Sequence, residues 1–228
     1  MRSASGPTQL DTAYDRLRSD ILSCRLRPGT RIHINEVAEE LQVSVGAVRE
    51  ALSRLAAEDM AVATAQKGYS VPEVSIEELR DLTNTRIAIE EFCLRDSIAH
   101  GDIEWETELV AAYHRLQRLP EREPSDPTRL SDAWSAAHQR FHAALVAGCK
   151  SPWMLKIRGM LYVQTERYRR LSVPLRTTER DVAAEHKGIF DAVMAKDGDL
   201  TAELMRRHLT LTTEILVGSA ELSETNIQ

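Results

Sequence analysis

The apolar positions in the N-terminal part of the chain recur at helical spacing in three segments. From Gln9 to Cys24 an apolar residue returns every three or four positions, and the LRPGT turn then ends the helix. A second helix is predicted over INEVAEEL and a third over VGAVREALSRLAAED, separated by the tight turn QVS. The positions of the third helix expected to face inward are Val45, Val48, Leu52 and Leu55. Two short helices joined by a tight turn predict a helix-turn-helix, whose second helix enters the DNA major groove.

The periodicity changes at MAVATAQKGYSVPEV, where two short β-prone stretches flank Gln66, Lys67 and Gly68. A hairpin tip requires a positive φ, and Gly68 adopts one without steric cost. The pattern therefore predicts a wing after the helix-turn-helix.

A domain boundary is expected at Pro72 and the stretch EVSIEEL, because Ser75 followed three residues later by Glu78 is a capping box that opens a helix. We predict a DNA-binding domain at 1–72, a linker at 73–78 and an all-α domain at 79–220. The second domain shows helical periodicity only, over 76–99, 103–119, 127–148, 152–171, 176–196 and 199–218. The expected fold class is therefore mainly α, with an N-terminal winged helix-turn-helix and a C-terminal six-helix antiparallel bundle.

Charge is distributed unevenly between the two predicted domains. The net charge of −6 argues against nucleic-acid binding only while it is averaged over the 228 residues. Residues 1–72 hold nine Lys+Arg and nine Asp+Glu, so the whole excess of acid lies in the second domain. Five arginines near the helix-turn-helix either contact phosphate or form a solvated helix and turn: Arg16, Arg18, Arg25, Arg27 and Arg31.

Cysteine usage and hydropathy favour a cytoplasmic protein. Cys24, Cys93 and Cys149 are far apart in sequence and form no CxxC, so neither a disulfide framework nor a cysteine zinc site is expected. The N-terminal segment lacks an apolar core, and no run approaches the roughly 18 apolar residues of a membrane helix. We expect neither export nor membrane insertion.

The stretch HQRFH places His138 and His142 four positions apart. Residues at this spacing lie on the same face of a helix, so both imidazoles can reach one metal ion. A zinc protease with this spacing has a glutamate directly after the first histidine as its base, and here that position is Gln139. The pair could therefore share a metal ion, but it lacks the base of a zinc protease.

Two blocks of sequence resemble a known family. The segments PGTRI, EVAEELQVS, VREALSRLAAED and KGYSV resemble the winged-helix domain of GntR-type bacterial transcription regulators. The remainder is similar to the FCD ligand-binding domain of the FadR subfamily, in the shorter version of its VanR-like branch. This resemblance implies a homodimeric repressor that binds a pseudo-palindromic operator and is controlled by a small organic acid.

The resemblance also assigns a role to the recognition helix. Arg49 matches the arginine that contacts DNA, and its guanidinium offers a bidentate fork to guanine or phosphate. The family usually has basic residues where this chain has Asn35 and Val45, so we expect a different operator sequence. Ser44 either caps the recognition helix or donates to a phosphate.

Wing residues are the remaining DNA-contact candidates. Lys67, Gly68 and Tyr69 either follow the minor groove and backbone of DNA or form a solvated hairpin tip.

By the same resemblance, four histidines match the metal ligands of FCD domains. They are His138, His142, His186 and His208. The family usually has an aspartate at the position of His138, and an all-imidazole set suits zinc, nickel or copper better than manganese. We expect one divalent ion per subunit, with zinc or nickel favoured, although any one of these histidines alone is more often structural. His33, His100 and His114 lie outside this pattern and are expected at the surface.

A cationic cavity for the effector is expected beside the metal. Four neutral imidazoles leave the charge of a divalent ion uncompensated, so an anionic ligand is favoured. Arg86 matches the family arginine that faces the cavity, in an R-x-x-x-E pattern with Glu90; the alternative is a surface ion pair. Arg167 and Tyr168 either line the cavity or belong to a charge-dense helix face.

Two alternatives to the effector-controlled regulator remain open at this stage. A metal-dependent enzyme needs a positioned base. Glu185, adjacent to His186, points roughly 100° away from it around a helix, so the sequence does not guarantee such a base beside the histidines. In the other alternative, a regulator responds to the metal itself without an organic effector.

Overall fold

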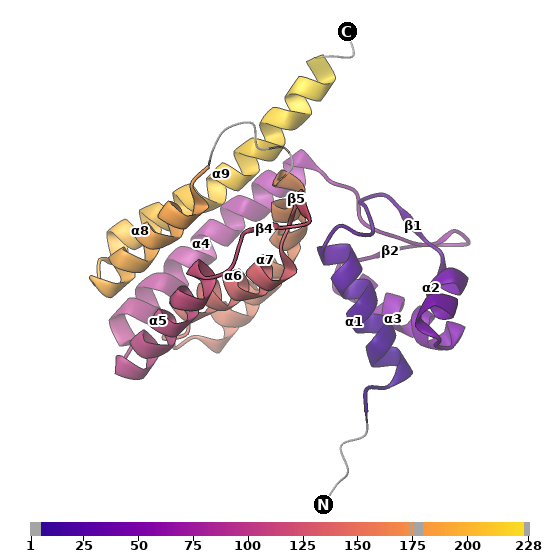
Figure 1. Ribbon diagram of the computed structural model, residues 1–228, viewed down its shortest axis with the longest axis horizontal. Coiled ribbons are helices and arrows are strands. Elements are labelled where there is room, and N and C mark those ends of the chain that lie inside the picture. The colour runs from indigo at the N-terminus through magenta and orange to yellow at the C-terminus, as the bar shows by residue number, and fades with distance from the viewer. Residues whose placement is uncertain (1–5, 174, 176–179, 226–228) are drawn as a thin grey trace, which may run out of the picture. The chain divides into compact units, whose positions relative to one another are not determined.

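The computed structural model describes residues 6–173, 175 and 180–225, with side chains described up to residue 218. These residues form two compact units that divide between Ser75 and Ile76 (Figure 1). The division lies within residues 73–78, the segment predicted as a linker. Each unit has its own core, so each is described separately.

The N-terminal unit is a winged helix-turn-helix, as predicted. Its elements are α1 (Gln9–Leu22), β1 (Arg31–Ile32), α2 (Ile34–Leu41), α3 (Val45–Ala57), β2 (Val62–Thr64) and β3 (Gly68–Ser70). The strands form an antiparallel sheet in the order β1-β3-β2, and β1, only two residues long, was not predicted. Gln42 at φ 53° closes the turn between α2 and α3. The sheet thus fixes the wing against the helices.

The buried face of α3 differs at one position from the prediction. Val48, Leu52 and Leu55 are fully buried, as expected, whereas Val45 is 40% exposed. Ala51 takes its place in the buried set, because positions 48, 51, 52 and 55 share one side of the helix. Val45 is the first residue of α3, where the helix leaves the core.

The wing turns at a left-handed backbone conformation, as predicted. Gly68 has φ +88°, and Gln66 also has a positive φ of 62°. The amide of Lys67 donates to the carbonyl of Thr64 across the turn at 3.0 Å. Lys67 is thereby held at the tip of the β2–β3 hairpin.

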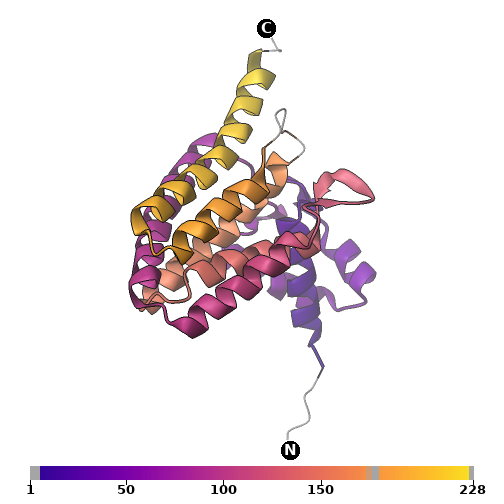
Figure 2. The same ribbon diagram turned by 60° about the vertical axis from the view of Figure 1, so that its left-hand side comes forward.

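The C-terminal unit is a helical bundle. Its helices are α4 (Ile76–His100), α5 (Ile103–Gln117), α6 (Asp132–Leu145), α7 (Pro152–Ser172), α8 (Val182–Met194) and α9 (Gly198–Thr225). The two longest, α4 and α9, lie side by side, as do α8 and α9 (Figures 1 and 2). None of the helices in the described parts of the chain is both long and apolar enough to cross a membrane.

A small hairpin interrupts the bundle, which corrects the prediction of helices only. Strands β4 (Arg122–Glu123) and β5 (Asp126–Leu130) pair antiparallel where the third bundle helix was expected to begin at residue 127. Pro127 lacks an amide hydrogen, and its carbonyl accepts from the Arg122 guanidinium at 2.6 Å. Helix α6 begins only after Ser131, whose hydroxyl accepts from the Trp134 amide.

Helix α8 also begins later than predicted. The expected start at residue 176 lies outside the described residues, and Arg180 and Asp181 are not helical. Asp181 caps the helix, because its carboxylate accepts from the Ala184 amide at 2.8 Å.

The apolar core of the bundle surrounds a polar interior. Leu94, Leu109, Phe141, Ile189 and Met205 are 1% exposed or less and bring five helices together. Close to this core, four histidines are buried on α6, α8 and α9. A buried polar group is costly unless it has a partner, so this interior requires a chemical explanation.

Candidate functional site

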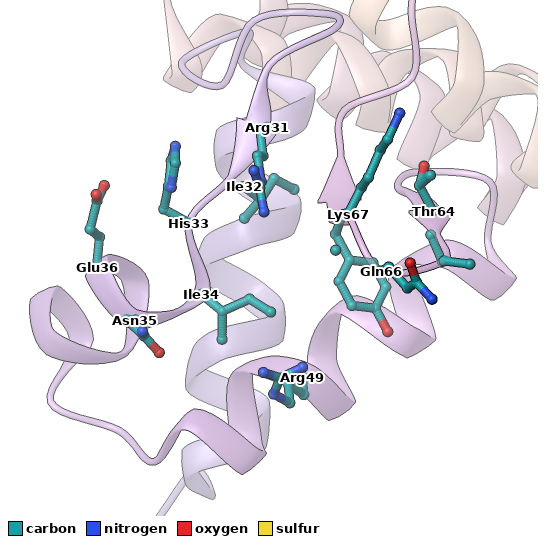
Figure 3. Close-up of a pocket in the computed structure, with 14 residues that line it drawn as sticks. Arg31, Ile32, His33, Ile34, Asn35, Glu36, Arg49, Thr64, Gln66 and Lys67 are labelled. Atoms are coloured by element: carbon teal, nitrogen blue, oxygen red, sulfur yellow. The ribbon is translucent and has the colours of Figure 1, made fainter.

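A groove of about 640 Å³ lies between the helix-turn-helix and the wing of the N-terminal unit (Figure 3). Figure 3 shows Arg49 of α3 between the start of α2 and the wing. The groove is lined by Arg31, Ile32, His33, Ile34, Asn35, Glu36, Arg49, Ala63, Thr64, Ala65, Gln66, Lys67, Gly68 and Tyr69. The fold thus brings four of the predicted DNA contacts together: Arg49, Lys67, Gly68 and Tyr69.

The groove is cationic. Arg31, Arg49 and Lys67 line it, and Glu36 is its one acidic residue. Among the described residues none of these three cations has an ion-pair partner. Solvated and unpaired cations in a concave surface favour an anionic polymer such as the DNA backbone.

Ser44 lies outside this groove and caps α3. Its hydroxyl accepts from the Ala47 amide at 3.2 Å, which is the capping alternative of the sequence analysis. Its own amide donates to the Gln9 side chain at 3.0 Å.

Two of the five arginines of the predicted cluster form ion pairs within the protein. Arg16 forms an ion pair with Asp20 at 2.6 Å, and Arg25 pairs with the same carboxylate at 2.5 Å. Of the five arginines, Arg31 is the one that reaches the groove.

In the C-terminal unit the four predicted histidines meet. Their potential ligand atoms all lie within 4.8 Å of one another, and all four residues are buried. The Nε2 atoms of His142 and His186 are 3.4 Å apart. Zinc–nitrogen bonds of about 2.0–2.1 Å place two ligands of a tetrahedral ion about 3.3 Å apart, so this separation fits a shared ion. The histidines form a potential metal site, whereas His33, His100 and His114 are exposed as predicted.

Burial keeps these imidazoles in the form that binds metal. Desolvation, followed by the neighbouring histidines, lowers the pKa of His138 and His142 well below the ordinary value. Desolvation lowers the pKa of His186 and His208 in the same direction. A neutral imidazole has a lone pair to donate, so the residues present fit a divalent ion of the zinc or nickel type.

Two of the four histidines have a hydrogen-bond partner other than histidine on another helix. His138 Nδ1 lies 3.0 Å from the Tyr162 hydroxyl, and His208 Nδ1 lies 2.7 Å from the Glu185 carboxylate. Glu185 was expected to point away from His186, and the structure shows that it contacts His208 on the next helix instead. Burial alone raises the pKa of Glu185, but hydrogen bonds from Arg180 and His208 lower it to about 2. This carboxylate is therefore ionised and engaged, and it is not available as a free base.

Arg86 is buried, which excludes the surface ion pair considered from the sequence. Its guanidinium lies 3.3 Å from the Glu90 carboxylate and donates to the Thr165 hydroxyl at 2.6 Å. Arg158 donates to the other oxygen of Glu90 at 3.0 Å. A fully buried carboxylate is thus held between two arginines.

A small internal cavity of about 30 Å³ adjoins the histidines. It is lined by Leu79, Thr83, Arg86, His138, Thr165, Tyr168, Arg169, His208, Leu209, Thr212 and Thr213. Tyr168 therefore lines the cavity, whereas Arg167 does not, and its neighbour Arg169 was missed. Nothing local in the sequence distinguishes Arg169 from Arg167. The rotation of α7 about its own axis decides which of the two arginines faces the cavity.

The two units match two known protein families. Residues 9–71 match the bacterial regulatory proteins of the gntR family, and residues 81–211 match the FCD domain. A Paraburkholderia xenovorans protein named HTH-type transcriptional regulator BphR is 40% identical over 207 residues, which cover 91% of this chain and 84% of that protein. The HTH-type transcriptional repressor GlaR of Escherichia coli is 34% identical over 216 residues, covering 92% of this chain and 96% of GlaR.

Solved structures are similar in fold. E. coli McbR/YncC superimposes with a TM-score of 0.72 at 18% identity, covering 93% of this chain and 99% of that one. A GntR regulator of Rhodococcus sp. RHA1 also has a TM-score of 0.72, at 20% identity, with 91% and 97% of the two chains covered. At these identities the likeness concerns the fold alone.

Proposed function

The chain belongs to the gntR family of bacterial regulatory proteins and carries an FCD domain, and from this premise we propose that it is a cytoplasmic repressor controlled by a metal-bound carboxylate. It is a DNA-binding transcription regulator and not an enzyme, which removes the metalloenzyme alternative. The observation that supports the finer proposal is the cluster of four buried histidines, two of which, His138 and His208, line one cavity together with Arg86. Repression is supported by the name of the relative GlaR.

We propose that the groove of the N-terminal unit binds operator DNA. In this proposal Arg49, near the start of the recognition helix, forms two hydrogen bonds with a guanine edge, which its place in the groove lining supports. Lys67, Gly68 and Tyr69 follow the backbone or minor groove, and Ser44 presents the N-terminus of α3 to a phosphate. Asn35 replaces the basic residue usual in the family, so the operator differs from that of its relatives.

The protein is proposed to bind a pseudo-palindromic operator as a homodimer. Symmetric half-sites about one DNA turn apart require two recognition helices. Exposed apolar residues recur at three- and four-residue spacing along α7: Trp153 is 70% exposed, Ile157 39% and Met160 62%. Such a stripe is typical of a protein contact, so a second copy is proposed to cover it. Met160→Glu should lower the apparent mass in sedimentation equilibrium, whereas Ile103→Glu on α5 should not; equal masses contradict this surface.

The metal centre is proposed to hold one divalent ion per subunit. His138, His142, His186 and His208 are its ligands, and an all-imidazole set favours zinc or nickel. The ion supplies a fixed positive charge beside the cavity, to which an anion binds.

The effector is proposed to be a small organic acid. One carboxylate completes the metal coordination while Arg86 binds the tail or a second carboxylate. A cavity of about 30 Å³ holds about two water molecules, so the acid must be small and cavity side chains must move to admit it. Arg86 exchanges its bond with Thr165 for the effector, and Glu90 keeps Arg158 as its partner.

The small size of the cavity also favours a second candidate, a regulator that responds to the metal alone. In this candidate the ion itself draws α6, α8 and α9 together, and no organic ligand is needed. The two candidates share the histidines and differ in the role of Arg86.

Operator release distinguishes the two candidates. A duplex selected from a random pool is followed by fluorescence anisotropy while zinc, then mono- and dicarboxylates, are added. The acid should weaken DNA binding about 5- to 150-fold in the zinc-loaded protein. It should have no such effect on the metal-free protein or on Arg86→Ala, whereas the control Arg95→Ala, exposed on the same helix, should respond like the wild type. Release by zinc alone supports the second candidate, and equal responses of all proteins to the acid contradict the proposal.

A further inference from the structure

Glu185 connects two helices at the edge of the metal centre. It lies on α8 directly before His186, but its carboxylate contacts Nδ1 of His208 on α9 at 2.7 Å. Arg180 donates to both oxygens of the same carboxylate, at 2.7 and 2.6 Å. Arg180 also donates to the His208 carbonyl at 2.8 Å and to the Thr212 hydroxyl at 2.9 Å. The Arg180–Glu185 pair is thus fixed to the turn of α9 that carries His208.

The Arg180 guanidinium also lies 3.4 Å from Nδ1 of His208, but the carboxylate contact at 2.7 Å is much shorter and determines which nitrogen of His208 is available. An ionised carboxylate accepts hydrogen bonds and cannot donate, so the hydrogen of the neutral imidazole is on Nδ1. The lone pair is then on Nε2. A carboxylate behind an imidazole fixes its tautomer and ring orientation and increases the basicity of the opposite nitrogen.

The other three histidines have weaker support. His138 has the neutral Tyr162 hydroxyl at Nδ1, and buried His142 Nδ1 has no hydrogen-bond partner among the described residues. The closest polar neighbour that the structure gives for His186 is Nε2 of His142, at 3.4 Å. Among the described contacts of the four imidazoles, Glu185 is the one that brings a negative charge.

We propose that Glu185 is a positioning residue of the metal centre, which orients His208 with Nε2 toward the ion and supplies the negative charge absent from the four imidazoles. Arg180 holds the carboxylate in place. This inference rests on the proposed metal centre and deepens it, because it assigns the affinity of the site partly to a residue that does not touch the ion.

The test uses the full chain with Glu185→Gln, which keeps the shape and removes the charge, and Glu185→Leu, which removes the acceptor as well. Glu108→Gln on the exposed face of α5 is the matched control. The affinity for zinc is measured by competition with a chelating dye. Loss of such an outer contact weakens metal binding about 10- to 100-fold, and this decrease is expected for both variants but not for the control.

A second measurement reports the tautomer without metal. In the metal-free protein with ¹⁵N-labelled histidine, NMR should show His208 as the Nδ1–H tautomer at pH 7.5. Glu185→Leu should lose this preference, while circular dichroism should show an unchanged helix content. If Glu185 contributed only to folding, a variant that stays folded would keep the wild-type ¹⁵N chemical shifts of the His208 ring.

The outcomes separate this inference from the proposed function. If the wild type binds zinc and both variants bind it equally well, Glu185 has no positioning role and the metal centre stands. If the wild type binds no zinc, the metal centre itself is wrong and the role of Glu185 with it. An Nε2–H tautomer of His208 in the wild type overturns the inference in either case.

Discussion

The cationic groove and the histidine centre of this protein depend on opposite environments. Arg31, Arg49 and Lys67 are exposed, so that DNA phosphates can reach them and salt can screen them. The four histidines are at most 6% exposed, and the same burial that makes a charge costly keeps them neutral. Changes in the groove should therefore affect DNA binding alone, whereas changes in the centre should affect both metal binding and folding.

The largest expected effect is on metal binding. His142→Ala should weaken zinc binding at least 100-fold, more than the roughly 10- to 100-fold cost of losing an outer contact, because a direct ligand is removed. His114→Ala, on the exposed face of α5, is the control. The measurement is metal content by elemental analysis together with the zinc-induced shift in melting temperature. A variant that retains one ion per subunit would exclude His142 as a ligand.

The second effect concerns stability and pH. Because burial lowers the pKa of His138, His142 and His186, these residues bind protons more readily unfolded than folded. The stability of the metal-free helical unit is therefore complete above the ordinary histidine pKa of about 6.5 and decreases as the pH falls below it. Protonation of three histidines changes the free energy of unfolding by up to about 4 kcal/mol per pH unit, because each proton contributes about 1.4 kcal/mol.

Urea unfolding followed by tryptophan fluorescence measures this slope. Trp105, Trp134 and Trp153 all belong to the helical unit, so the signal reports that unit alone. Equal free energies of unfolding at pH 5.5 and 7.5 would show that the histidines stay hydrated, and the contrast between the two sites would disappear.

The third effect is on DNA affinity. Arg49→Ala should cost about 1–3 kcal/mol of binding free energy and relax specificity at one operator position, if this arginine contacts a base. Arg54→Ala is the control, because Arg54 is on the same helix but does not line the groove. Zinc affinity should be unchanged in both variants. Unchanged operator affinity in a folded Arg49→Ala protein would remove this residue from base recognition.

The smallest effect is expected at the wing. Lys67→Ala should weaken binding to all sequences about equally and reduce the salt dependence, log K against log [salt], by about one unit, because one phosphate contact is lost. Anisotropy titrations between 50 and 200 mM salt measure this slope. A sequence-selective loss would instead indicate that Lys67 contacts a base.

The winged unit was predictable because its signals are local. Helical periodicity, a tight turn and a glycine with positive φ all lie within one stretch of about 60 residues, and each constrains only its neighbours. The error at Val45 arose at a helix end, where periodicity does not show how far the core extends. The missed hairpin at 122–130 had a local signal in Pro124 and Pro127, which argue against a helix there.

The histidine centre was predictable only in part. The spacing of His138 and His142 indicated a shared helix face, but His186 and His208 were assigned from resemblance to a family. Glu185 and Arg169 could not be found in this way. Their roles depend on how α8 lies against α9 and how α7 is rotated toward the cavity, and neighbouring residues in the sequence do not determine either.

By itself, the sequence determined the winged helix-turn-helix, the helical character of the second unit and the residue types available for metal and DNA. The tertiary structure decided that Arg86 is buried rather than exposed, that the Glu185 carboxylate contacts His208 on the next helix, and that the cavity beside His138 and His208 measures only about 30 Å³. The physical reason is the distance along the chain over which each effect acts. Backbone conformation and periodicity act over a few residues, whereas desolvation and hydrogen bonding act between groups that the packed helices bring together from distant parts of the chain.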